Sequence, residues 1–231
     1  MSSKIIKIAA AEDLRYTITE LCEHYKELYP DIITEIFPNS SGMLFKQIST
    51  HVPFDIFFSA DVKYPNKLEE LKLTVGKPTI FAIGQLVLWS SKKDVSKGLE
   101  MLLSDDIGNI SIANPEVAPY GKRAFEALIY YKIFDQVKNK IVIAEDVLRA
   151  GQTILNGYSD AGLIALSLAR ATEFSERGKY FLIDEKSYSR PEQAFVILKQ
   201  SKETTDFIKY LESNKAKDIL RKYGFRIPQN H

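Results

Sequence analysis

The 231-residue chain has little cysteine, no excess of either charge and no long apolar run. Cys22 is its single cysteine, so an intrachain disulfide and a thiolate metal cluster are both excluded. Lys and Arg total 31 against 30 for Asp and Glu, so no overall field attracts nucleic acid. No segment approaches the roughly 20 apolar residues that span a bilayer. A ligand would therefore have to be recognised by local chemistry.

Catalytic signatures are missing as well. The sequence contains no Gly-x-Ser-x-Gly elbow, no Walker loop and no Gly-x-Gly-x-x-Gly fingerprint. His24, His51 and His231 lack the spacing of metal ligands. We therefore expect a protein that is not an enzyme, that needs no cofactor for binding and that holds no resident metal centre.

Strand-like and helix-like segments alternate along the chain. In the first half, strands are predicted at Lys4–Ala10, Ile32–Phe37 and Asp55–Ala60, with helices between them. The apolar segment Thr79–Ser90 is long enough to cross from one lobe into another, and strand–helix units resume after Ile110. This alternation predicts an α/β fold with two lobes and mostly parallel sheets.

Four turns between a predicted strand and the next helix share one kind of chemistry. Small residues allow close approach to the backbone, and the first turn of a helix offers N–H donors with a partial positive charge. Two of the turns fall in each half of the chain, which favours a ligand held between two lobes. Taken singly, each turn predicts no more than a capped helix, with Asp13, Ser41 and Asp146 as suitable caps. The turns are Ala9–Asp13, Pro38–Gly42, Asn114–Gly121 and Ala144–Val147.

The order of these turns, together with Asp55–Asp61 and Tyr223–Phe225, resembles the molybdate-binding proteins of bacterial ABC transporters. The similarity extends over nearly the whole chain. It implies a type II periplasmic-binding-protein fold, in which two α/β lobes are joined by a strand hinge and enclose an interlobe ligand cleft. The implied lobes are residues 1–82 with 197–231, and residues 83–196.

The resemblance also implies a ligand and a set of binding residues. Molybdate, and tungstate as well, would be bound through its oxygens by neutral donors at helix N-termini. Ser41 would donate its hydroxyl and backbone N–H, and Tyr120 and Val147 their backbone N–H groups. A tyrosine hydroxyl that some family members place near Ala165 is missing here. The implied ligand-binding residues are Glu12, Asp13, Ser40, Ser41, Tyr120 and Val147.

Glu12 and Asp13 depart from the family pattern, because many members have a neutral donor in this turn. A carboxylate about 3 to 4 Å from a dianion would be repelled by several kcal/mol in a dry site. We therefore expect both side chains to turn away, with Asp13 capping its helix and backbone N–H groups facing the ligand. The alternative is that one carboxylate accepts a proton from a protonated oxyanion, which would favour a ligand of the phosphate or sulfate class.

Partner and location follow from the same resemblance. The implied partner is the membrane permease of an ABC transporter, which docks a loaded monomer, and the implied location is periplasmic or extracytoplasmic. No signal peptide precedes Lys4, so either an export signal is missing from this sequence or the protein is cytoplasmic. A cytoplasmic ligand-sensing domain of the same fold is an alternative, and an enzyme of this fold would have to use Glu12 or Asp13. Asp55 and Asp61 are predicted to anchor turns.

Overall fold

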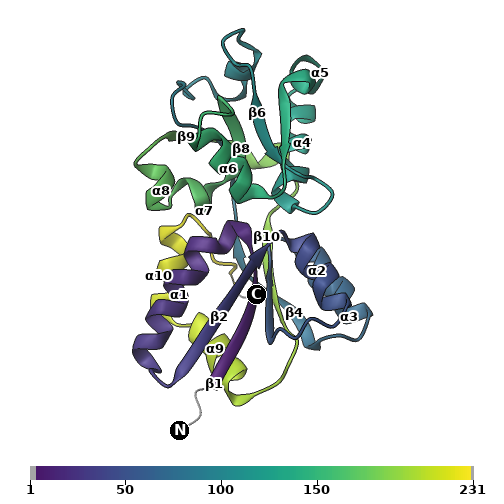
Figure 1. The fold of residues 1–231 in the computed structure, drawn as a ribbon, viewed down its shortest axis with the longest axis vertical. Helices are drawn as coiled ribbons and strands as arrows, with labels where there is room; N and C mark the ends of the chain where they lie inside the picture. Colours follow the sequence, from purple (N-terminus) through teal and green to yellow (C-terminus); the bar gives the residue numbers. More distant parts are fainter. Residues whose placement is uncertain (1–3, 230–231) are drawn as a thin grey trace. The chain divides into compact units, whose positions relative to one another are not determined.

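The computed structural model describes residues 4–229, which fall into two compact units (Figure 1). The first unit is Met1–Ile83 with Glu192–His231, and the second is Gly84–Pro191. The chain therefore passes from the first unit to the second after Ile83 and returns after Pro191. The two crossing segments lie side by side, because the N–H of Gly84 donates to the carbonyl oxygen of Pro191 at 2.9 Å.

The division differs from the predicted one at both crossings. Ile83 and residues 192–196 were predicted in the second lobe and lie in the first unit. The reason is β10 (Glu192–Ile197), which pairs antiparallel with two strands of the first unit. Its first two residues, Glu192 and Gln193, are polar, so an apolar pattern does not mark the start of this strand.

The first unit is built on a five-stranded sheet with the order β2-β1-β3-β10-β4. β1, β2 and β3 are parallel, whereas β10 runs antiparallel to both of its neighbours, β3 and β4. The prediction of mostly parallel sheets is therefore correct for β1, β2 and β3. It is wrong for β4 and β10, which lead into and out of the second unit and pair antiparallel. The strands are β1 (Lys4–Ala11), β2 (Ile32–Asn39), β3 (Ile56–Ser59), β4 (Val75–Ile83) and β10 (Glu192–Ile197).

Helices cover both faces of this sheet, with α1, α9 and α10 on one side and α2 and α3 on the other (Figure 1). On the α2 and α3 side, Leu44, Ile48 and Leu68 pack with Phe57 of the sheet in a core from which water is excluded. The burial of such side chains supplies most of the stability of a helix of this length. The helices are η1 (Glu12–Leu14), α1 (Arg15–Leu28), α2 (Ser41–Ser49), α3 (Lys63–Glu70), α9 (Lys202–Leu211) and α10 (Asn214–Lys222).

The second unit repeats the same strand pattern, with the order β7-β6-β8-β5-β9. β6, β7 and β8 are parallel, and β5 is antiparallel to β8 and β9. α4 and α6 pack against β6 and β8 from different sides of the sheet (Figure 1). The strands are β5 (Leu86–Ser90), β6 (Ile110–Ala113), β7 (Ile141–Ala144), β8 (Ala161–Ala165) and β9 (Lys179–Leu182).

The second unit has two long helices and several short ones. α4 and α6 follow the strands β6 and β7, as the alternation of the sequence predicts, whereas the short helices have too few residues to show a period. The helices are η2 (Gly98–Leu103), α4 (Pro119–Tyr130), α5 (Phe134–Val137), η3 (Lys138–Lys140), α6 (Val147–Leu155), α7 (Leu166–Ala169), α8 (Thr172–Ser175) and η4 (Glu185–Ser187).

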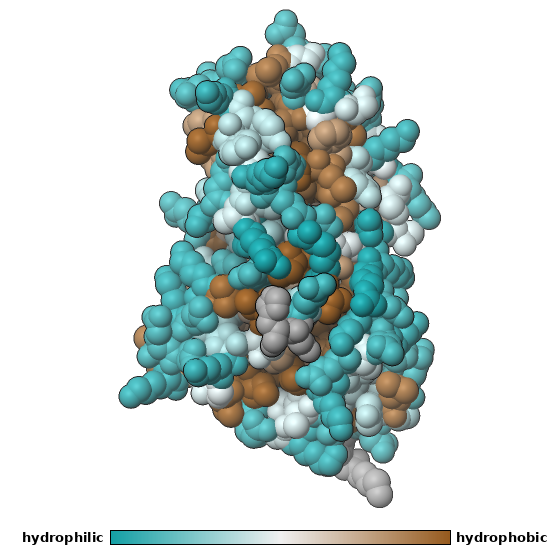
Figure 2. Space-filling view, turned by 180° about the vertical axis from the view of Figure 1, so that it is seen from behind, coloured by the Kyte–Doolittle hydropathy of each residue, from teal (hydrophilic) through white to brown (hydrophobic). Residues whose placement is uncertain are grey.

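The face drawn in Figure 2 is predominantly hydrophilic, with apolar patches between the hydrophilic residues. None of the helices within residues 4–229 is long and apolar enough to cross a membrane.

Candidate functional site

In the first unit, the parallel strands bring three turns to one edge of the sheet. Ala11 of β1 is opposite Asn39 of β2, and Ala10 is opposite Phe58 of β3. The residues that follow these strands, including Glu12 and Ser40, therefore meet at the carboxyl edge, where ligands bind in α/β proteins.

Ser40 and Ser41 have different hydrogen-bonding roles at the start of α2. Ser40 is the N-cap residue, and its hydroxyl oxygen accepts a hydrogen bond from the N–H of Met43 at 3.4 Å. Ser41, which was predicted as a cap, is the first helical residue, so the cap prediction is wrong by one position. The hydroxyl oxygen of Ser41 accepts instead from the N–H of Ala60 at 3.0 Å. This contact uses Ser41 as an acceptor and leaves its hydroxyl proton available for donation.

The Glu12 side chain is held by Arg15. Nε and Nη2 of Arg15 donate to the two carboxylate oxygens of Glu12, at 2.9 and 2.7 Å. A bidentate guanidinium–carboxylate pair is among the stronger and better oriented hydrogen-bonded pairs in proteins. The Glu12 side chain is nevertheless only 7% exposed, so Arg15 pairs with a carboxylate that belongs to a largely buried side chain.

Asp13 does not cap a helix, which contradicts the prediction. It lies within the short helix η1, whose cap position is Ala11, while the cap position of α1 is Leu14. A cap residue must precede the first turn in an extended conformation, and Asp13 already belongs to that turn. Its carboxylate oxygen Oδ2 accepts instead from Nε2 of Gln193, at 2.8 Å, at the start of β10.

Asp61 anchors a turn, as predicted, whereas the carboxylate of Asp55 joins two strands instead. The carboxylate of Asp55 accepts from the N–H of Lys7 at 2.7 Å, which ties the start of β3 to β1. Asp61 accepts from the N–H of Tyr64 at 3.3 Å, near the start of α3. Burial, and then the negative charge of Asp61, raises the pKa of Tyr64. Both carboxylates therefore have structural partners.

In the second unit, β6 and β7 end side by side, with Ala113 opposite Ala144. The N–H of Asn114 donates to the carbonyl oxygen of Ala144 at 2.8 Å, which holds the two following turns together. Asp146 is the N-cap of α6, as predicted, and accepts from the N–H of Arg149 at 2.8 Å. Val147 is therefore the first residue of α6, where N–H groups lack partners within the helix.

Tyr120 lies in the first turn of α4, directly after Pro119. Because proline has no N–H, Tyr120 carries the first N–H group of this helix. The close approach of α4 to β6 depends on Gly121, since a Cβ atom there would lie 2.1 Å from the carbonyl oxygen of Ala113. The glycine thus sets the position of the N-terminus of α4 and of Tyr120.

The structure brings the predicted residues together within each unit. Glu12, Asp13, Ser40 and Ser41 lie at the carboxyl edge of the first sheet, and Tyr120 and Val147 at that of the second. Sequence reasoning missed Arg15, Gln193 and Ala60 as partners of these residues. Arg15 is signalled by its position three residues after Glu12, whereas the partners from distant strands have no local signal.

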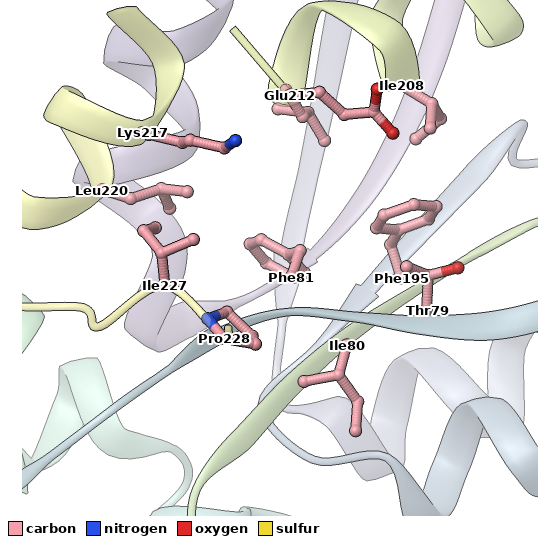
Figure 3. A pocket seen from close by; sticks show the side chains of 11 residues that line it. Thr79, Ile80, Phe81, Phe195, Ile208, Glu212, Lys217, Leu220, Ile227 and Pro228 are labelled. Carbon is pink, nitrogen blue, oxygen red and sulfur yellow. The ribbon is translucent and has the colours of Figure 1, made fainter. Parts of the chain in front are cut away.

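A separate hollow in the first unit has a different chemistry. It is a cavity of about 560 Å³ against β4, β10, α9 and α10. In the close-up view, Phe81 and Phe195 lie below Lys217 and Glu212 (Figure 3). None of the predicted site residues lines it, and its charged lining residues are Glu212 and Lys217.

No group of three or more His, Cys, Asp or Glu residues could hold a metal ion within residues 4–229. The Nδ1 atom of His24 lies 3.0 Å from the hydroxyl oxygen of Tyr210, a contact within the helical layer of the first unit. His51 lies in a turn with a positive φ of 65°, and His231 lies outside the described residues.

Two α/β units, each with helix N-termini at the carboxyl edge of parallel strands, are typical of proteins that bind small ligands at such edges. The sequence matches the family described as bacterial extracellular solute-binding protein over residues 6–226. The chain belongs to this family.

Individual relatives agree with the assignment. The molybdate-binding protein ModA of Azotobacter vinelandii is 29% identical over 226 residues, which cover 95% of this chain and 89% of the relative. The solved structure of the periplasmic molybdate-binding protein of Azotobacter vinelandii has a TM-score of 0.89 and 28% identity, covering 97% of this chain and all of that one (100%). A Bacillus subtilis lipoprotein, YvgL, provisionally named as the substrate-binding part of an ABC transporter, is 27% identical over 95% of this chain and 85% of its own.

These similarities confirm the predicted resemblance and the type II periplasmic-binding-protein fold.

Proposed function

We propose that this protein captures molybdate, with tungstate as an alternative ligand of equal charge, for import by an ABC transporter. The single observation that carries the proposal concerns Ser41, the first residue of α2. Its hydroxyl oxygen accepts a hydrogen bond from the backbone N–H of Ala60. A hydroxyl held in this way can donate to an anion, next to N–H groups that carry a partial positive charge. Relatives that are named as molybdate-binding proteins support this ligand.

The proposed ligand residues lie at helix starts within each unit. Ser40 and Ser41 start α2, Tyr120 lies in the first turn of α4, and Val147 starts α6. The turn Glu12–Asp13 would contribute backbone N–H groups. All of these donors are neutral, which suits a fully ionised oxyanion that has no proton to give.

The alternative for a protonated ligand requires an available carboxylate acceptor. Arg15 donates to both carboxylate oxygens of Glu12, whereas the hydrogen bond from Gln193 reaches only Oδ2 of Asp13. The pairing disfavours Glu12 as the acceptor of a ligand proton, so a ligand of the phosphate class would have to use Asp13. For the proposed function, binding involves no catalysis and no cofactor.

Partner and location are part of the same proposal. The family description as extracellular, and the ABC-transporter name of the Bacillus subtilis relative, support an extracytoplasmic protein that delivers its ligand to a membrane permease. They disfavour a cytoplasmic sensing domain. We expect the protein to act as a monomer.

Isothermal titration of the purified protein with molybdate, tungstate, sulfate and phosphate tests the ligand. Molybdate and tungstate should bind with a single site and comparable dissociation constants, and phosphate should bind much more weakly. Sulfate is smaller, so its rejection would show that the pocket selects for size. If neither molybdate nor tungstate produced a binding heat, the proposal would be wrong.

A further inference from the structure

A negatively charged pair of residues, Glu12 and Asp13, lies in one of the turns that the proposed function assigns to a dianion. The proposed function by itself does not explain how such a turn tolerates the ligand, because like charges at short range in a water-poor site repel strongly. The inference below rests on that function and concerns the charge balance of this turn.

We propose that Arg15 is a specificity-determining residue, which makes this turn compatible with a dianion by pairing with the Glu12 carboxylate. The pairing has two effects. The guanidinium offsets the negative charge of Glu12, and the two hydrogen bonds hold both carboxylate oxygens in one orientation. Arg15 would thus set how strongly the site favours doubly charged over singly charged tetrahedral ions.

The position of Arg15 supports a dedicated role. It is the first residue of α1, where the helix dipole disfavours a cation and favours an anion. Its side chain is 38% exposed while that of Glu12 is 7% exposed, so the arginine reaches inward from a partly hydrated position. An arginine placed against the dipole to meet a buried carboxylate indicates that the Glu12 charge has to be balanced there.

The carboxylates of Asp13 and Glu12 accept hydrogen bonds from different kinds of side chain. Its partner Gln193 is uncharged, so this hydrogen bond orients the Asp13 carboxylate without supplying a positive charge. Gln193 is fully buried in β10, whose first residue directly follows the crossing segment. Gln193 is therefore a positioning residue for the Asp13 carboxylate, whereas Arg15 supplies a positive charge to Glu12.

A double-mutant cycle tests the proposal with two tetrahedral ions of different charge, molybdate and perrhenate. Arg15→Met should raise the dissociation constant for molybdate by at least about tenfold, because the Glu12 charge is no longer offset. Perrhenate carries one charge instead of two, so the logarithm of its change should be about half as large. Glu12→Gln together with Arg15→Met should return the dissociation constant for molybdate close to the wild-type value.

Two further variants separate charge from shape. Arg15→Lys keeps the positive charge but loses the bidentate geometry, so it should lose less molybdate affinity than Arg15→Met. Lys26→Met removes a positive charge from the last turn of the same helix, 11 residues and about 16 Å further along, and should leave both affinities near wild type. Thermal unfolding shows whether each variant folds. If Arg15→Met does not fold, the affinities of Arg15→Lys are compared with those of the wild type instead.

The outcomes are distinguishable. If wild-type protein bound neither ion, the proposed function and this inference would both be wrong. With wild-type binding intact, the inference alone would be overturned by an unchanged molybdate affinity in Arg15→Met. The inference would also be overturned if Arg15→Met lost affinity equally for molybdate and perrhenate and the double variant did not regain affinity for molybdate. That result would assign Arg15 a purely structural role.

Discussion

The hydroxyl oxygen of Ser41 accepts a hydrogen bond from the backbone N–H of Ala60 at 3.0 Å. This contact joins the first residue of α2 to the residue that follows β3, so two turns at the carboxyl edge of the first sheet are held together. Because Ser41 is the acceptor, its hydroxyl proton can be directed at a ligand. The relationship makes Ser41 the most direct target for mutagenesis.

Replacement of Ser41 by alanine should weaken molybdate binding by about 1.5–3 kcal/mol, the usual range for a hydrogen bond to a charged group. Isothermal titration measures the change. Ser49→Ala is the matched control, because Ser49 is in the same helix and its hydroxyl donates to the carbonyl oxygen of Phe45. A Ser41→Ala protein that bound molybdate as tightly as the control would exclude Ser41 as a ligand.

Gly121→Ala should destabilise the second unit and also weaken ligand binding. The added Cβ atom would lie 2.1 Å from the carbonyl oxygen of Ala113, so α4 would have to move away from β6. Overpacking of this kind typically costs about 1–3 kcal/mol, and the shift would displace Tyr120. Chemical denaturation gives the stability, and titration gives the affinity.

Gly108→Ala is the control for that variant, since its Cβ atom would have Asp160 Oδ2 as its nearest neighbour at an ordinary 3.5 Å. Equal stabilities for the two glycine variants would show that α4 can move without cost.

The Cys22 thiol should be almost unreactive in the folded protein. Burial raises its pKa from the ordinary 9.0 to about 12. At about pH 8 the thiolate fraction is therefore lower by about a thousandfold than in an unfolded chain, and burial slows access further. Alkylation by iodoacetamide, followed by mass spectrometry, should be slow in buffer and fast in denaturant.

The same shift has a consequence for stability. Because the folded state keeps the thiol protonated, this contribution is complete below pH 9.0 and is lost as the pH rises toward about 12. Alkylation at similar rates in buffer and in denaturant would contradict the buried position of Cys22.

The affinity for molybdate should be nearly constant from about pH 6 to about pH 9, because a fully ionised anion bound by neutral donors exchanges no proton on binding. Titrations at several pH values at constant ionic strength measure this. A change of about tenfold per pH unit would instead indicate a proton shared between the ligand and a carboxylate, with Glu12 and Asp13 as the first candidates.

Much of the fold could be predicted from local patterns. Apolar patterns located β1, β2 and β3 to within one or two residues, because the apolar residues of a strand are contiguous or alternate along a short stretch of sequence. The N-cap of α6 was predicted as well, since Asp146 satisfies an N–H only three residues away. Features whose physical cause lies within a few residues can be recognised in this way.

The tertiary structure decided the features that depend on distant partners. The Asp13 carboxylate binds Gln193, which is 180 residues further along the chain, so no local rule could replace the expected helix cap with this contact. The N–H that orients Ser41 comes from Ala60 at the end of another strand. β10 joins the first unit through backbone pairing, although its first residues are polar. The sequence by itself determined which turns carry donors, because helix starts are local; the three-dimensional fold determined how each side chain in those turns is held, because their partners lie on strands that meet only in the folded sheet.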